Sequence, residues 1–297
     1  MSNAAAEDFA VVVENLEKRF GSFAAVNRIS FQVARGEIFG FLGPNGAGKS
    51  TTIRMLCGIL APTAGRGTVA GFDIRTQAEQ IKANIGYMSQ RFSLYQDLTV
   101  EENIDFYSGI YRIPAERKRQ RKEWVIEMSG LAGHRRSLTA ILSGGWRQRL
   151  ALGCAILHEP PIVFLDEPTS GVDPISRRQF WDLIYDLSGK GVTVFVTTHY
   201  MDEAEYCNRL GLIYRGELIA LGTPHELKVE MARGTEVAAG EIVDASENDW
   251  RQPPPSPSPP SRQPPPSPSI LPSLEDVFVA RIEARDRAEQ PQQEVQR

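Results

Sequence analysis

Residues 43–51 read GPNGAGKST and fit the pattern of a phosphate-binding loop, G-x-x-x-x-G-K-[ST]. A glycine-rich loop lets backbone N–H groups surround a phosphate chain, because no side chains intervene. We expect Lys49 to reach the β- and γ-phosphates of a nucleotide and the Ser50 hydroxyl to ligate Mg²⁺. The residues expected to contact the nucleotide here are Gly43, Pro44, Asn45, Gly46, Ala47, Gly48, Lys49, Ser50 and Thr51.

The segments on either side of this loop supply the context that the motif requires. Residues 38–42 are an apolar run that predicts a buried strand, and residues 51–57 have helical spacing. The start of that helix adds about half a positive charge beside the phosphates. A strand, a glycine loop and a helix in this order argue against a chance match in a glycine turn.

Two carboxylates follow a second apolar run. Residues 161–165 carry no polar side chain and predict a strand buried on both faces, as in a parallel sheet. At its end we expect Asp166 to hold Mg²⁺ and Glu167 to polarise the attacking water as a general base. His199 ends a neighbouring apolar strand, where its imidazole would contact the γ-phosphate; the alternative is a purely structural histidine.

Residues 142–145, Leu-Ser-Gly-Gly, open another helix and form a second helix start able to face a phosphate. We call residues 142–145 the signature segment. One nucleotide does not need two such cradles in one chain. The pair makes sense if Ser143, Gly144 and Gly145 of one chain close over ATP held by Lys49 of another chain.

Phe20 precedes a Gly-Ser turn and has two interpretations. Its ring either belongs to the core or stacks on a purine, whose π-face suits aromatic contact.

The alternation of strands and helices predicts an α/β fold with a mainly parallel sheet. Short alternating strands before residue 38 predict a small antiparallel sheet beside the nucleotide. Residues from about 90 to 158 form a mostly helical insert, with a capping box at Thr99 and Glu102. Together these elements define an ATP-binding domain over residues 8–228.

The periodic pattern ends beyond residue 228. Residues 229–272 are acidic and then rich in proline, with the run RQPPPSPS at residues 251–258 repeated at 262–269. Such a run predicts an extended polyproline II linker, with an SH3-type ligand as the alternative. Residues 273–297 predict a short amphipathic helix and a disordered tail from residue 290.

The composition is that of an ordinary globular protein. Of 297 residues, 41% are hydrophobic and 24% charged, and the net charge of −4 gives no bulk attraction to nucleic acid. No apolar run approaches the ~18–20 residues that cross a bilayer. Residues 1–10 lack the basic start and apolar core of a signal peptide. We therefore expect a cytosolic chain with core thiols at Cys57 and Cys154, whose membrane role needs a partner.

From about residue 9 to residue 228 the chain resembles the ATP-binding-cassette (ABC) transporter ATPases, whose motifs it carries in the family's order. The resemblance implies a P-loop NTPase fold with a helical insert subdomain. It assigns adenine stacking to Phe20, Mg²⁺ sensing and coupling to the membrane domain to Gln90, the D-loop to Asp173, and the γ-phosphate switch to His199. Trp146 stands where the family usually has glutamine.

Residues 93–103, 198–205 and 272–278 are similar to bacterial type-2 exporters, which move drugs, sodium, or polysaccharide and lipid-linked glycans. This resemblance implies ATP and Mg²⁺ as cofactors. It also implies transmembrane permease subunits and a second ATPase subunit, identical or sister, as partners. The location implied is peripheral, on the cytoplasmic face of the inner (cell) membrane, and no nucleic acid is expected.

Two alternatives remain. One is a soluble ABC ATPase that uses ATP as a conformational switch in translation or on chromosomes; a single phosphate loop and the lack of heptad arms argue against it. The other is a subunit of an importer. The transported substrate is not readable from this chain, because selectivity lies in the membrane partner.

Overall fold

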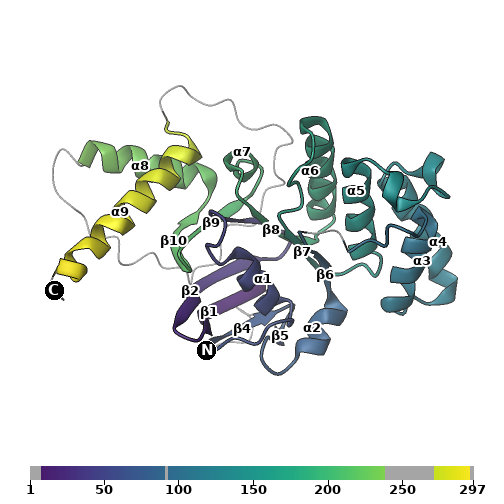
Figure 1. Cartoon of the computed structure of the whole chain (residues 1–297), viewed down its shortest axis with the longest axis horizontal. Coiled ribbons are helices and arrows are strands. Elements are labelled where there is room, and N and C mark those ends of the chain that lie inside the picture. Colours follow the sequence, from purple (N-terminus) through teal and green to yellow (C-terminus); the bar gives the residue numbers. More distant parts are fainter. Residues whose placement is uncertain (1–7, 91–92, 238–270, 295–297) are drawn as a thin grey trace.

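Two β-sheets, stacked helices and a C-terminal helix make up the computed structural model, which describes residues 8–90, 93–237 and 271–294 (Figure 1). The proline-rich repeat at residues 251–269 lies outside the described residues.

The six-stranded sheet carries the buried apolar runs of the sequence. Its order is β10-β9-β3-β8-β7-β6, and every adjacent pair is parallel except β10 and β9. All residues of β3 and β7 are buried, because helices and the second sheet cover both faces. The mainly parallel α/β fold is thereby confirmed. The strands are β3 (Ile38–Leu42), β6 (Ile85–Met88), β7 (Ile162–Asp166), β8 (Thr193–Thr198), β9 (Arg209–Tyr214) and β10 (Glu217–Gly222).

The second sheet is antiparallel and has the order β2-β1-β4-β5. Its strands are β1 (Phe9–Phe20), β2 (Phe23–Ala34), β4 (Ala64–Val69) and β5 (Phe72–Asp73). Aromatic rings join it to the parallel sheet: Phe31 of β2 lies 5.6 Å from Phe39 and Phe41 of β3 and 6.1 Å from Phe195 of β8, measured between ring centroids. Burial of these large rings fixes the antiparallel sheet against the strand that leads into the glycine loop.

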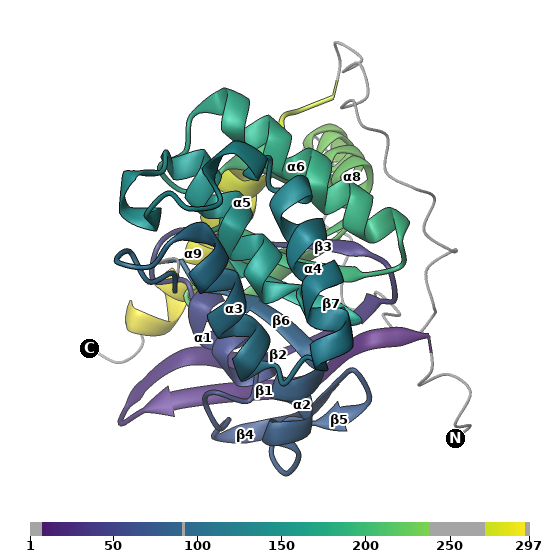
Figure 2. The same cartoon turned by 90° about the vertical axis from the view of Figure 1, so that its right-hand side faces the viewer.

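Helices α3, α4 and α5 form a layer beside the sheets, seen in front in Figure 2. They enclose a hydrophobic cluster of their own, with Ile104, Val125 and Leu150 fully buried. The capping box starts α3 as expected: Thr99 Oγ1 accepts from the Glu102 N–H, and the Thr99 N–H donates to the Glu102 carboxylate at 2.8 Å. The helices before the C-terminal pair are α1 (Lys49–Leu56), α2 (Ala78–Asn84), α3 (Val100–Ile110), α4 (Ala115–Met128), α5 (Gly144–Ala155), α6 (Pro174–Gly189) and α7 (Met201–Ala204).

The C-terminal part of the chain is more ordered than its composition indicated. Helix α8 (Pro224–Val237) runs through the boundary that we placed after residue 228. Helix α9 (Leu274–Glu294) continues past residue 290, where we expected disorder. Leu274, Val277 and Phe278 are buried in the same cluster as the strands of the parallel sheet. Helix α9 therefore completes the core around the parallel sheet, a tertiary contact that the local composition does not encode.

The sequence analysis expected no membrane-spanning segment, and it expected cysteines that lie in the core. No helix among the described residues is long and apolar enough to span a membrane. Cys57, Cys154 and Cys207 are all buried. Burial raises the pKa of each thiol, so these groups stay protonated within the core.

His158, at the end of the segment that follows α5, predicts a pH dependence of stability. Its ring stacks on Tyr111 with centroids 3.8 Å apart, and Nε2 lies 3.0 Å from the carbonyl oxygen of Ile85. Burial lowers the pKa of His158 from its usual 6.5 to about 4. The neutral ring therefore contributes stability that is fully present above pH 6.5 and is lost as the pH falls towards 4.

A His158→Gln variant keeps an amide donor for Ile85 but does not titrate. We expect the difference in free energy of unfolding between wild type and this variant to shift in the variant's favour between pH 7.5 and pH 5. Urea denaturation at the two pH values measures it. Parallel losses in both proteins would show that His158 is not the titrating group.

Candidate functional site

The loop of residues 43–51 joins β3 to α1, and two of its glycines admit no side chain. A Cβ on Gly43 would lie 2.2 Å from the carbonyl oxygen of Ile213, and one on Gly48 would lie 2.5 Å from that of Ala25. Gly48 also has a φ of +111° and is the N-cap residue of α1, so no side chain of the cap occupies the helix start. The first N–H groups of α1 are thus left for an external acceptor, and a phosphate chain fits this cradle.

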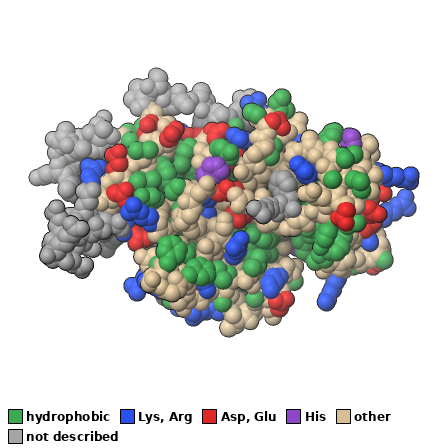
Figure 3. All heavy atoms as spheres, viewed as in Figure 1, with side chains coloured by type: hydrophobic (Ala, Val, Ile, Leu, Met, Phe, Trp, Pro, Cys, Tyr) green, Lys and Arg blue, Asp and Glu red, His purple; other side chains and the backbone are tan. Residues whose placement is uncertain are grey.

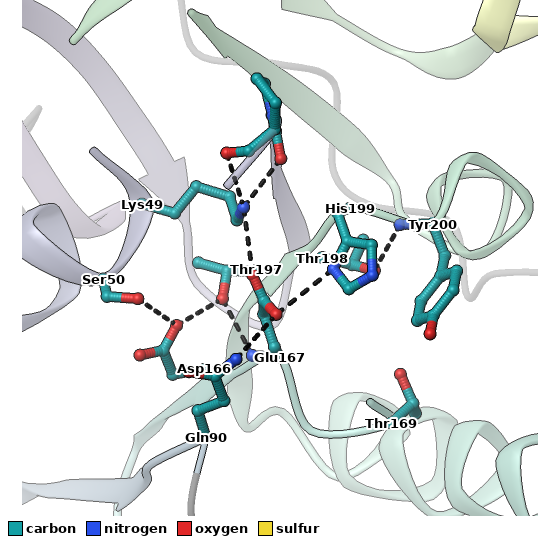
Figure 4. Close-up of polar contacts among 12 residues, drawn as sticks. Lys49, Ser50, Gln90, Asp166, Glu167, Thr169, Thr197, Thr198, His199 and Tyr200 are labelled. Carbon is teal, nitrogen blue, oxygen red and sulfur yellow. Dashed lines mark hydrogen bonds and ion pairs between the residues drawn. The ribbon is translucent and has the colours of Figure 1, made fainter. Parts of the chain in front are cut away.

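Lys49 points back over the loop that precedes it (Figure 4). Its side chain is 4% exposed, and Nζ donates to the carbonyl oxygens of Gly43 at 2.7 Å and Pro44 at 3.1 Å. Nζ also forms an ion pair with Glu167 Oε1 at 3.1 Å. Phosphate oxygens bound by this ammonium would replace Glu167 as its counter-ion, so nucleotide binding would be linked to release of the carboxylate.

Oxygen ligands suited to Mg²⁺ meet between α1 and the ends of two strands. Ser50 Oγ donates to Asp166 Oδ1 at 3.1 Å, and Thr197 Oγ1 donates to the same oxygen at 2.8 Å. Within the described ranges no group of three or more His, Cys, Asp or Glu residues could hold a metal. A hydroxyl and one carboxylate nevertheless fit Mg²⁺, which usually keeps waters and takes phosphate oxygens as its other ligands.

Glu167 lies at the centre of the convergent side chains in Figure 4. It follows β7 in the left-handed region, with φ 47°, and its N–H donates to Thr197 Oγ1 at 3.0 Å. Gln90 Nε2 donates to Glu167 Oε2 at 3.1 Å, and His199 Nδ1 lies 3.2 Å from the same oxygen. The structure thus brings Gln90, Lys49 and His199 around one carboxylate that is only 7% exposed.

The signature segment lies apart from this group and packs on α6. Ser143 caps α5 by accepting from the Trp146 N–H at 3.4 Å. A Cβ on Gly145 would lie 2.3 Å from Ser176 Oγ, so the starts of α5 and α6 touch there. Asp173 caps α6 by accepting from the Ser176 N–H at 2.9 Å, and this hydrogen bond lowers the pKa of the Asp173 carboxyl.

Two aromatic residues of the sequence analysis now have defined surroundings. Phe20 is 52% exposed beside the turn between β1 and β2, so the interpretation as a core ring is wrong. It lies under Lys18, whose Nζ is 5.3 Å from the ring centroid, and hydrophobic side chains gather over this sheet in Figure 3. Trp146 contacts His134 of its own chain, with ring centroids 4.2 Å apart.

Thr197 is the residue of the site that the sequence analysis missed. It orients the Asp166 carboxylate and accepts from the backbone of Glu167. Its signal was present, because the buried run at residues 192–196, which is apolar apart from Thr193, continues into two threonines before His199. A hydroxyl at the carboxyl end of a parallel strand adjacent to the acidic pair is a candidate ligand or positioning residue.

Strand β8 lies between the strand that leads into the phosphate loop and the strand that ends at Asp166, so the ends of all three meet at one edge. A glycine cradle, an acidic pair and a histidine at this edge define a P-loop ATPase of the ATP-binding-cassette type.

Comparison with known proteins supports this class. The family model described as "ABC transporter" matches residues 26–170, and one described as "AAA domain, putative AbiEii toxin, Type IV TA system" matches residues 147–201. The linearmycin resistance ATP-binding protein LnrL of Bacillus subtilis (strain 168) is 40% identical over 72% of this chain and 69% of its own length. The chain therefore belongs to the ABC transporter ATP-binding proteins.

A relative with higher sequence identity is a longer protein than this chain. The probable multidrug ABC transporter ATP-binding protein YbhF of Escherichia coli (strain K12) is 52% identical over 75% of this chain, and the match spans 38% of that protein's length. Among solved structures, a dimeric post-hydrolysis state of the ATP-binding cassette MJ0796 bound to ADP and Pi superposes with a TM-score of 0.65. It is 26% identical, over 72% of this chain and 98% of the other.

Thr197 carries a testable prediction. In a Thr197→Val variant the Asp166 carboxylate loses the hydroxyl that orients it, so we expect the Mg²⁺ concentration for half-maximal ATP hydrolysis to rise roughly ten-fold. A Thr193→Val variant is the matched control: Thr193 lies on the same strand but accepts from the Gly36 N–H, at the opposite end. Equal Mg²⁺ dependence in the two variants would contradict the role of Thr197.

Proposed function

We propose that the chain is the ATP-binding and hydrolysing subunit of an ABC transporter. It dimerises around Mg·ATP and drives export through a separate transmembrane permease. The observation that carries the proposal is the Glu167 carboxylate, which lies within 3.2 Å of Lys49, Gln90 and His199 at the edge of the phosphate cradle. The relatives, named for multidrug transport and linearmycin resistance, support export as the direction.

In this proposal each polar side chain of the site has a role in binding or hydrolysing ATP. Lys49 and the N–H groups of the loop bind the phosphates, while Ser50, Asp166 and the Gln90 amide oxygen hold Mg²⁺. The metal, when bound, neutralises the charge that develops on the transferred phosphoryl group. Lys49 then turns from Glu167 to the phosphates.

The freed Glu167 carboxylate polarises the attacking water and accepts a proton from it. The water oxygen bonds to the γ-phosphorus as the bond to the β–γ bridging oxygen breaks, leaving ADP and phosphate. His199 contacts the γ-phosphate and positions the Glu167 carboxylate.

Closure needs a second ATPase chain. The starts of α5 and α6, which carry Ser143, Gly144, Gly145 and Asp173, do not join the group around Glu167 through the contacts described above. We propose that they cover the nucleotide of the partner, with Phe20 stacking on adenine in each chain's own site. The dimeric state of the MJ0796 cassette supports this arrangement.

The permease is proposed to contact the surface that follows Gln90. Tyr95, Phe106 and Ile110 are exposed there, and the rings of Tyr95 and Phe106 lie 4.6 Å apart. An exposed apolar group of this kind is suited to contact a membrane partner. The chain would then lie peripherally on the cytoplasmic face of the cell membrane. The relatives do not favour the alternative of a soluble switch without transport.

Glu167→Gln tests the general base. The amide keeps the shape of the side chain but cannot accept the proton of water, so hydrolysis should fall by about 10²-fold or more. ATP should then trap a dimer, measured by size-exclusion chromatography with light scattering in Mg·ATP. The double variant Lys49→Ala/Glu167→Gln should stay monomeric, because it no longer binds the phosphates. Near-normal hydrolysis by Glu167→Gln would rule out Glu167 as the base.

Affinity purification of the tagged chain from detergent-solubilised membranes tests the transport assignment. We expect a multi-spanning protein in stoichiometric amount, identified by mass spectrometry. Recovery only from the soluble fraction with ribosomal or DNA-associated proteins would contradict it.

A further inference from the structure

The turn between β9 and β10 contacts the phosphate loop directly. The Gly216 N–H donates to the carbonyl oxygen of Ala47 at 2.9 Å, and the Gly216 carbonyl accepts from the Asn27 N–H of β2 at 2.7 Å. Gly216 has a φ of +82°, and a Cβ there would lie 3.0 Å from the carbonyl oxygen of Ala25. The main chain of this turn thus joins the phosphate loop to the antiparallel sheet.

Helix α9 holds the same turn from its other side. Arg285 Nε donates to Glu217 Oε2 at 2.7 Å, and Asn27 Nδ2 donates to Glu217 Oε1 at 2.9 Å. Arg215 Nη1 donates to Asp286 Oδ1 at 3.0 Å. Figure 1 shows α9 crossing beside β10, so the C-terminal helix is close to this turn in space although it is distant in sequence.

The hydrogen bond to Ala47 has a geometric consequence for nucleotide binding. In a trans peptide the C=O and the following N–H point in opposite directions. Fixing the Ala47 carbonyl on Gly216 therefore aims the Gly48 N–H away from the turn. Backbone N–H groups at this point of the loop are the ones that bind phosphate. The position of the turn thus limits how the loop presents its donors.

We propose that Arg285 and Glu217 are positioning residues for the ATP site, and that α9 sets the affinity for ATP by holding the β9–β10 turn against the phosphate loop. The proposal rests on the proposed ATP-binding function. It gives the helix beyond the proline-rich repeat a role in substrate binding. When α9 leaves the turn, the Ala47 carbonyl loses its fixed partner and ATP binding weakens.

The burial of the ion pair indicates what kind of effect to expect. The side chains of Arg285 and Glu217 are 33% and 30% exposed, and such an ion pair adds little to overall stability. The effect of breaking it should therefore appear in the local geometry of the turn rather than in the unfolding of the protein. A change in ATP affinity without a matching change in melting temperature is the signature of positioning.

Arg281 supplies a matched control on the same helix. It lies one turn before Arg285, is also 33% exposed, and pairs with Glu230 of α8 instead of the β9–β10 turn. Replacing either arginine by alanine removes one ion pair of α9 with similar exposure. Only Arg285→Ala removes a contact to the turn that touches the phosphate loop.

The experiment measures the Kd of ATP in EDTA, where hydrolysis is suppressed, and then KM and kcat in Mg²⁺, on the full chain. We expect Arg285→Ala to raise Kd and KM roughly three- to ten-fold with kcat at saturation unchanged. Arg281→Ala should keep the wild-type values, and Arg285→Lys should recover most of the affinity. Glu217→Gln should resemble Arg285→Ala, and the double variant should be no weaker than either single variant, because both single variants remove the ion pair between Arg285 and Glu217.

Three outcomes separate the claims. If wild type and Arg281→Ala bind ATP and Arg285→Ala binds it equally well, this inference is wrong and the proposed function stands. If both arginine variants lose affinity to the same extent, α9 acts only through stability and the positioning role is refuted. If the wild-type chain binds no ATP, the proposed function itself fails and the inference fails with it.

Discussion

The buried ion pair between Lys49 and Glu167 is the interaction on which the rest of the site depends. Both side chains are almost inaccessible, and removing one partner of a buried pair typically costs about 3–5 kcal/mol, because the other charge is left uncompensated. In this structure, the cation that we propose to bind phosphate and the carboxylate that we propose as the base are therefore each other's counter-ions. A polyanion that binds the ammonium would replace the carboxylate there, so in the proposed mechanism the arrival of substrate would free the base.

The parallel sheet makes this pairing possible. Lys49 and Glu167 are 118 residues apart in the sequence, yet each follows the carboxyl end of a strand. Strand β8 lies between those strands; it supplies Thr197 and is followed directly by His199. Parallel strands place their carboxyl ends at one edge, so buried apolar runs in the sequence determine where polar residues meet. The apolar core between the sheets then fixes the glycine loop relative to that edge.

Much of the site was predictable from local sequence. The glycine spacing and the acidic pair after an apolar strand are motifs of a few residues, and each indicates its chemistry without knowledge of the tertiary contacts. Thr197 and the extent of α8 and α9 were not predicted, and the local sequence left open whether Phe20 is buried or exposed. Each depends on which elements pack together: Phe20 lies at a hairpin end that nothing in the described chain covers fully, and α9 is held by buried contacts of Leu274 and Phe278 with distant strands. Periodicity over one segment carries no information on such contacts.

The contact of Gly145 with Ser176 limits how the chain can move. Because there is no room for even a methyl group between them, the starts of α5 and α6 pack closely, and we expect them to move together as one lever. In the proposed dimer this lever would carry the segment over the partner's nucleotide together with Asp173, which caps α6. A displacement of either helix start would then move the other as well, so we expect opening at one nucleotide of the proposed dimer to be coupled to opening at the other.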